Sequence, residues 1–262
     1  MSLRINSDFN GVTDPDAGAY IAAVEAADGN QLLEFAVGKA INDFVVGCKA
    51  DGIWNAIKAS CILAGARTLS GALVPLAGSA PTNINNNFVD SDYNRKTGLK
   101  GNGINDSTGK RLNTNFAENA VPQNSIHASI YISQQASALK YHLFGTDNQN
   151  ATGIWNSGGT ATQLFSRNAQ QTHSINNPTG FIGSSRFASN QTAARGNSAD
   201  QTISTLSSAG VNTGTFYVFS PSTVNQLSDG RLAFYSIGEA LDLAKLDARV
   251  TALINAFGAA IP

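Results

Sequence analysis

Residues 126–132 read IHASIYI, and this stretch decides the fold class. Apolar and polar side chains alternate along it, as they do on a β-strand that turns one face toward a core. One face would carry Ile126, Ala128, Ile130 and Ile132, and the other His127, Ser129 and Tyr131. The stretch therefore predicts a strand that lines the core of a sheet.

Similar short runs extend this pattern in both directions. Apolar segments at 60–64, 71–77, 139–144, 180–184, 215–219 and 231–235 are separated by loops rich in Asn, Gly and Ser. Many short strands with such turns are typical of antiparallel sandwiches and jelly rolls rather than of βαβ units. We therefore predict a mainly β fold, with an antiparallel sandwich over residues 59–236.

The first 58 residues predict a helical segment. Asp14 and Pro15 form a helix start, because Asp can cap the first turn and Pro needs no hydrogen bond there. A second helix follows, with an apolar stripe at helical spacing that we expect to pack inward. The stripe consists of Leu33, Val37, Ile41, Phe44 and Cys48.

Residues 237–262 predict a C-terminal helix. Ser236 and Glu239 match a capping box that would start it. Apolar residues then follow at spacings of three and four, which is the pattern of a short coiled-coil seam: Leu243, Leu246, Val250, Leu253 and Phe257. Two interpretations are open: the helix packs on its own sandwich, or it forms an oligomer interface, for which we predict a trimer.

The composition argues against several classes of partner. Only 13% of the residues are charged and the net charge is −1, so we expect no binding to nucleic acid. The sequence has no run of eighteen apolar residues and no apolar segment near Met1 that would act as a secretory signal, so we expect neither a membrane span nor export. Two cysteines, Cys48 and Cys61, do not form a disulfide framework.

Several segments resemble a known family. They read GIWNAIKASCILAG at 52–65, GALVPL at 71–76, APTN at 80–83, TGLKGNG at 97–103 and GRLAFYSIGEAL at 230–241. Together they resemble structural proteins of phage and prophage virions that carry a concanavalin A-like (laminin-G-like) jelly-roll module. Residues 140–215 resemble that family only in their general pattern of short apolar runs between polar loops.

The resemblance implies a position on the surface of a bacteriophage virion, in a tail fibre that binds the receptor or in a head decoration. It also implies synthesis in the host cytoplasm and contacts with other virion proteins. It is not specific to one activity, because one fold can serve many functions.

Residues that could support catalysis or metal binding are few and scattered. Glycosidases need two placed carboxylates, whereas the four glutamates, Glu25, Glu34, Glu118 and Glu239, are far apart in the sequence. The three histidines lie apart as well, so we predict no enzyme, no cofactor and no metal site. Residues 90–94 begin like a calcium loop but lack its glycine, which favours a surface turn; structural calcium held by separate loops is left open.

A glycan is the remaining ligand class that the sequence suggests. Trp155 lies between glycine-rich segments and could stack on a sugar, while Asn148, Asn150 and Asn156 could bind its hydroxyl groups. The alternative for Trp155 is packing in the core. We thus carry forward three hypotheses: a virion structural component, a lectin module for host attachment and, as a remote third, a polysaccharide-degrading enzyme.

Overall fold

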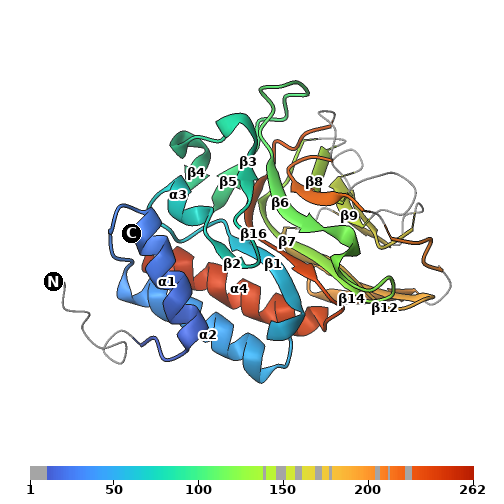
Figure 1. Cartoon of the computed structure of the whole chain (residues 1–262), viewed down its shortest axis with the longest axis horizontal. Coiled ribbons are helices and arrows are strands. Elements are labelled where there is room, and N and C mark those ends of the chain that lie inside the picture. Colours follow the sequence, from blue (N-terminus) through green and yellow to red (C-terminus); the bar gives the residue numbers. More distant parts are fainter. Residues whose placement is uncertain are drawn as a thin grey trace.

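The computed structural model describes residues 11–137, 140–145, 152–156, 161–168, 173–176, 179–203, 207–211, 213–221 and 226–262. A helical layer, a first sheet and a second sheet lie on one another (Figure 1). The pairings between the strands named below are antiparallel. This confirms the predicted class, a mainly β sandwich of the jelly-roll type with N-terminal helices and a C-terminal helix. None of the helices in these ranges has the length and apolar character that crossing a bilayer requires.

The first sheet, sheet A, has the order β14-β13-β12-β7-β16-β1-β2, with β5 joined to β16 and β4 to β5. Strands from both ends of the chain meet at its centre, where β16 lies between β1 and β7. The strands are β1 (Ile57–Ile62), β2 (Pro75–Ala77), β4 (Tyr93–Asn94), β5 (Gly98–Lys100), β7 (Ile126–Gln134), β12 (Gly180–Ala188), β13 (Gln191–Gly196), β14 (Ala199–Ile203) and β16 (Arg231–Gly238).

The second sheet, sheet B, has the order β11-β10-β9-β8-β15-β6-β3. Its strands are β3 (Thr82–Asn83), β6 (Leu112–Ala117), β8 (Lys140–Phe144), β9 (Gly153–Asn156), β10 (Ala161–Phe165), β11 (His173–Asn176) and β15 (Thr215–Val218). Short 3₁₀ turns occur at η2 (Trp54–Ala56), η3 (Ile84–Asn86), η4 (Asp90–Asp92) and η5 (Glu118–Ala120).

The core between the sheets is built by strand alternation. Ile126, Ala128, Ile130 and Ile132 of β7 are buried in one cluster with Ile154 and Leu164 of sheet B. Tyr131 points to the other side of sheet A, where it packs against a second cluster that includes the helices. The alternation read from residues 126–132 is therefore confirmed.

The N-terminal helices are α1 (Pro15–Ala27) and α2 (Phe35–Ala50). Asp14 caps α1 as predicted, because its Oδ1 accepts hydrogen bonds from the backbone N–H groups of Asp16 and Ala17 at 2.9 and 3.3 Å. The inward stripe of α2 is confirmed for Val37, Ile41, Phe44 and Cys48, all of which are buried. The helices cover the face of sheet A that points away from sheet B (Figure 1).

The C-terminal helix, α4 (Leu243–Ala260), lies against α2 and sheet A. The predicted oligomer seam is wrong for its five residues, because each side chain is already buried within the single chain. Leu243, Leu246, Val250, Leu253 and Phe257 are between 0% and 4% exposed. Of the two interpretations, packing on the sandwich holds, and the predicted trimer has no support from this helix.

Two local predictions near helix ends need correction. Ser236 does not cap α4, since β16 continues to Gly238 and the Ser236 hydroxyl bonds to His127. Asp242 is the cap instead, and its Oδ1 accepts from the N–H groups of Ala244 and Lys245. Residues 71–77 are not one strand: α3 (Leu69–Ala72) precedes β2.

The glycine-rich stretch 97–103 has a structural purpose. Gly98 has φ of +95°, and a Cβ added to it would lie 2.0 Å from the carbonyl oxygen of Leu232. A Cβ on Gly101 would lie 2.0 Å from the carbonyl oxygen of Ser228. Only glycine allows this close approach of backbone to backbone. The stretch is therefore required for packing against β16 and the residues just before it.

Candidate functional site

The four residues predicted to bind a glycan do not form one site in the described structure. Trp155 lies on β9 and is half-buried. Asn156 is fully buried, and its Nδ2 donates to the carbonyl oxygen of Ala136 at 2.8 Å, so its prediction as a sugar ligand is wrong. Asn148 and Asn150 lie outside the described residues.

Trp155 belongs to a row of side chains across the outer face of sheet B. The row pairs Gln163 with Trp155 and Trp155 with Tyr141 on three neighbouring strands. The Trp155 and Tyr141 rings stack with centroids 5.4 Å apart and planes 17° apart. The indole Nε1 is buried and has no hydrogen-bond partner among the described residues. The ring packs against Tyr141 and is partly exposed, and its stacking on a sugar stays a prediction.

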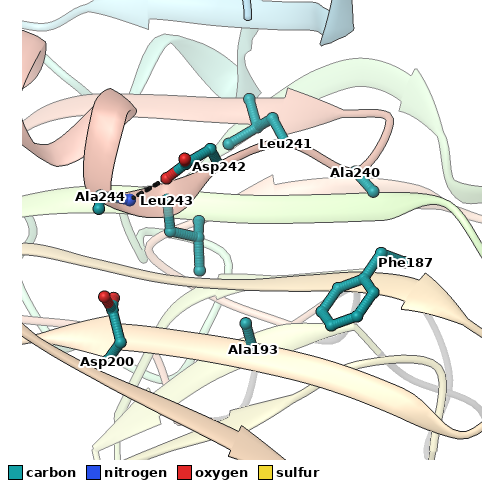
Figure 2. A pocket seen from close by; sticks show the side chains of 8 residues that line it. All are labelled: Phe187, Ala193, Asp200, Ala240, Leu241, Asp242, Leu243 and Ala244. Atoms are coloured by element: carbon teal, nitrogen blue, oxygen red, sulfur yellow. Dashed lines mark hydrogen bonds between the residues drawn. The ribbon is translucent and has the colours of Figure 1, made fainter.

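A groove on the other sheet has the features of a binding site more fully. It is a shallow cavity of about 530 Å³ on the outer side of sheet A, beside the start of α4. Its lining comes from β12, β13, β14 and the segment that enters α4: Phe187, Ala193, Asp200, Ala240, Leu241, Asp242, Leu243 and Ala244. Figure 2 shows Ala193 between the Phe187 ring and the Asp200 carboxylate.

Local structure explains why this groove is open. Ala193 has only a methyl group, so the floor of the groove is low between two larger side chains (Figure 2). The upper wall is fixed because the N–H groups of Ala240 and Leu241 donate to the hydroxyl oxygens of Ser125 and Ser185 at 3.0 and 3.1 Å. Phe187 is 48% exposed, so part of its ring borders the groove and is accessible to solvent.

The charges at the groove are acidic and held in place. Arg195 binds Asp200 at 2.8 Å through Nη1 and Asp247 at 2.7 Å through Nε. Burial alone would lower the pKa of Arg195, but its hydrogen bonds to the two carboxylates raise that pKa above the usual value. Asp242 is exposed and holds its Oδ1 toward the N–H groups that begin α4. Carboxylate oxygens thus face the groove at fixed positions.

Sequence reasoning missed all the main residues of this groove. Phe187, Asp200 and Asp242 come from three separate segments, so no local motif joins them. One signal was available for Asp242, because an Asp directly before the apolar stripe that starts at Leu243 is a good helix cap. The exposed position of Phe187 follows only from the register of β12.

The three histidines serve the fold. His127 Nδ1 lies 2.6 Å from the carbonyl oxygen of Glu239 and its Nε2 lies 2.7 Å from the Ser236 hydroxyl, so Nδ1 donates and Nε2 accepts. His142 contacts the Ser228 hydroxyl at 3.2 Å and His173 contacts that of Thr192 at 2.9 Å. Burial lowers the pKa of His127 and of His142 to about 4.

In the possible calcium loop, the carboxylates that would bind the ion already accept hydrogen bonds from other groups of the protein. Asp92 forms an ion pair with Lys110 and also accepts from the N–H group of Val89, while Asp90 accepts from the N–H group of Leu69. Within the described ranges, no group of three or more His, Cys, Asp or Glu side chains is arranged to hold a metal ion. These contacts favour the surface-turn interpretation of residues 90–94.

Comparisons with known proteins give only a general likeness. No protein-family model and no curated protein matches the chain. A Trypanosoma rangeli sialidase mutant matches 83% of this chain and 39% of its own, with a TM-score of 0.45 and 11% identity. The binding domain of botulinum neurotoxin DC matches over 59% of this chain and 42% of its own length, with a TM-score of 0.41 and 16% sequence identity. Domain 4 of a Geobacillus stearothermophilus arabinanase, solved with arabinotriose, matches over 54% of this chain and 73% of its own length, with a TM-score of 0.38 and 12% sequence identity.

These values describe similar β-sandwich shapes, and no functional argument rests on them. The chain spans about two fifths of the sialidase and of the neurotoxin domain.

Proposed function

We propose that the chain is a non-enzymatic glycan-binding module on the surface of a bacteriophage particle, and that the Phe187 groove holds the glycan. The observation that carries the proposal is the combination around Ala193 of an exposed aromatic ring with the Asp200 and Asp242 carboxylates. An apolar surface with a few fixed polar groups is the usual form of a small-ligand site.

A sugar ring suits this combination chemically. Its C–H face can lie on the Phe187 ring, while its hydroxyl groups donate to carboxylate oxygens. Each of the two aspartates has one oxygen engaged by the protein, Asp200 by Arg195 and Asp242 by backbone N–H groups. The carboxylates are therefore oriented before a ligand arrives, which lowers the entropic cost of binding.

The non-enzymatic part of the proposal is supported by the positions of the glutamates. Glu25 accepts from the N–H group of Leu33, Glu34 pairs with Arg95 and Arg67, Glu118 with Arg167, and Glu239 with Lys58. Hydrogen bonds from Arg95 lower the pKa of Glu34, opposite to what a general acid needs. Each glutamate thus has a structural partner.

The virion part rests on the similar segments at 52–65, 97–103 and 230–241. It includes a place in a tail fibre or in a head decoration, contacts with other virion proteins and synthesis in the host cytoplasm. A low-resolution map of purified particles, with antibody-labelled protein, tests this position. Protein found only outside the particle would contradict it.

The glycan part is tested by screening host surface and capsule glycans on an array and then titrating a hit by calorimetry. We expect Phe187→Ala to weaken binding about tenfold, equivalent to ~1.4 kcal/mol. Ala193→Leu, which fills the groove without removing any group, should abolish binding. Trp155→Ala is the matched control for the aromatic row on sheet B.

Three results would count against the proposal. Loss of binding in Trp155→Ala with full binding in Phe187→Ala would place the ligand on sheet B. An array without any hit would contradict the proposal that the ligand is a glycan. Release of reducing ends from a bound polysaccharide would contradict the proposal that the chain is not an enzyme.

A further inference from the structure

The charges around the Phe187 groove are unbalanced. Of the eight residues that line the groove, the two with charged side chains are both aspartates, Asp200 and Asp242. Arg195 shares its single positive charge between Asp200 and Asp247. One guanidinium thus stands against three carboxylates, which leaves a formal excess of two negative charges beside the groove.

The start of α4 does not offer a positive site to a ligand. The N-terminus of a helix normally attracts anions, but here Asp242 is the cap, and it already accepts from the N–H groups of Ala244 and Lys245. The Lys245 ammonium donates to the carbonyl oxygen of Asp51 at 3.1 Å, at the end of α2. This cation is therefore held at α2 rather than in the groove.

The backbone donors of the upper wall are also in use. The N–H groups of Ala240 and Leu241 donate to the hydroxyl oxygens of Ser125 and Ser185, and that of Ala244 donates to the cap. The carboxylates of the lining can only accept hydrogen bonds. A ligand group that donates therefore matches this lining, whereas a ligand carboxylate would meet acceptors of its own charge.

The positions of these groups suit one kind of sugar substituent. In Figure 2 the Asp200 and Asp242 carboxylates lie on one side of Ala193, and the Phe187 ring lies on the other. A sugar ring that rests on Phe187 can direct a substituent across Ala193 toward the carboxylates. An ammonium group is the substituent that fits best, because it is positive, has three donors and has no acceptor.

We propose that the groove selects glycans with a cationic amino sugar, one whose amine is free of an acetyl group, and rejects glycans whose sugars carry a carboxylate. This inference rests on the glycan-binding function proposed above and concerns its selectivity. At an exposed site, one pair of unit charges about 4 Å apart changes affinity about fivefold. The amine should therefore bind about fivefold more tightly than its N-acetyl form, and a uronate about fivefold more weakly than that form.

The test is calorimetric titration of the full chain with three sugars that differ in charge on one scaffold. The probes are β-1,4-linked trimers of glucosamine, N-acetylglucosamine and glucuronic acid. Affinity should decrease in that order. The differences should shrink at high salt, because the screening length falls to about 3 Å at 1 M. Ala193→Leu should abolish binding of each trimer that occupies the groove.

A variant separates the charge from the fold. Asp242→Asn removes a negative charge but retains the helix cap, because Asn caps a helix as well as Asp does. The ratio of the Kd of the N-acetyl form to that of the amine should fall about fivefold. Asp106→Asn removes an exposed carboxylate from the loop between β5 and β6, and as the matched control it should leave this ratio unchanged.

The inference alone is overturned if the glucuronic acid trimer binds in the groove as tightly as the glucosamine trimer, or if Asp242→Asn keeps the wild-type ratio. It is also overturned if other glycans bind in the groove while the glucosamine trimer does not. If no trimer and no glycan of the array binds, the proposed function fails and the inference fails with it.

Discussion

The two outer faces of the sandwich differ although both belong to antiparallel sheets. The outer face of sheet A is covered by α1, α2 and α4, and outward-pointing side chains such as Phe234 are fully buried there. Phe234 meets Phe44 of α2 edge to face, with ring centroids 5.8 Å apart. On the outer face of sheet B, Tyr141, Trp155 and Tyr217 are only half-buried. Sheet A therefore uses most of its outer face for stability and leaves it open at the groove over β12, β13 and β14, whereas sheet B leaves a row of aromatic side chains on its outer face partly exposed.

The strongest test of this difference places a charge on each face. Leu246→Asp puts a carboxylate beneath α4 at a fully buried position, and we expect it to remove most of the protein's stability, because it both deletes a buried leucine side chain and desolvates a carboxylate. Gln163→Asp on sheet B should change the free energy of unfolding by about 0.5 kcal/mol or less. Urea titration measures both, and similar losses would contradict the comparison.

A second test removes one aromatic ring from each face. Phe234→Ala should cost about 3–5 kcal/mol, because the helices cannot collapse fully into the cavity. Tyr217→Ala should cost much less, since its ring contacts solvent and the Arg111 guanidinium, whose centre is 5.6 Å from the ring centroid. Thermal unfolding of the two variants gives the difference, and equal costs would mean that sheet B is also covered.

A buried ion pair stabilises sheet B. Glu118, just after β6, and Arg167, just after β10, are fully buried and lie 3.2 Å apart from Oε1 to Nε. Glu118→Gln would leave the guanidinium without its counter-charge and should cost about 3 kcal/mol. A urea midpoint within error of the wild type would show that backbone carbonyls alone compensate the charge of Arg167.

A smaller, pH-dependent effect is expected for His127 on sheet A and equally for His142 on sheet B. Their folded-state pKa values are about 4, below the usual 6.5, because burial disfavours the charged form. Between these values the unfolded chain binds more protons, so stability is complete above about pH 6.5 and falls as the pH drops toward 4. Each histidine should contribute up to about 1.4 kcal/mol per pH unit within this window.

The difference between the free energies of unfolding at pH 7 and at pH 5 measures how steeply stability depends on pH. His127→Gln and His142→Gln should each reduce the pH dependence, whatever their effect at pH 7. A double variant with the wild-type slope would assign the pH dependence to other groups.

Local sequence patterns predicted the elements better than their partners. The alternation at 126–132 and the stripe of α4 gave the correct buried faces, because periodicity reports which side of an element is covered. It does not report what covers it, and for this reason the stripe of α4 was open to an interface interpretation.

Long-range contacts explain the remaining errors. Residues 69–72 form a helix because Asp28, far away in the sequence, accepts hydrogen bonds from the N–H groups of Arg67 and Thr68 at its start. The candidate groove could not be predicted for the same reason, since Phe187, Asp200 and Asp242 meet only after three segments have folded.

The helical cover of sheet A also determines when the chain can fold during synthesis. Strand β1 and helix α2 are made well before their neighbours β16 and α4 in sheet A and its helical layer. At the usual rates of translation, the apolar side of α2 waits on the order of tens of seconds for its partner. During that interval the nascent chain depends on chaperones, and a chain stopped before residue 243 would expose the apolar surface of α2 and sheet A that α4 covers and be expected to aggregate.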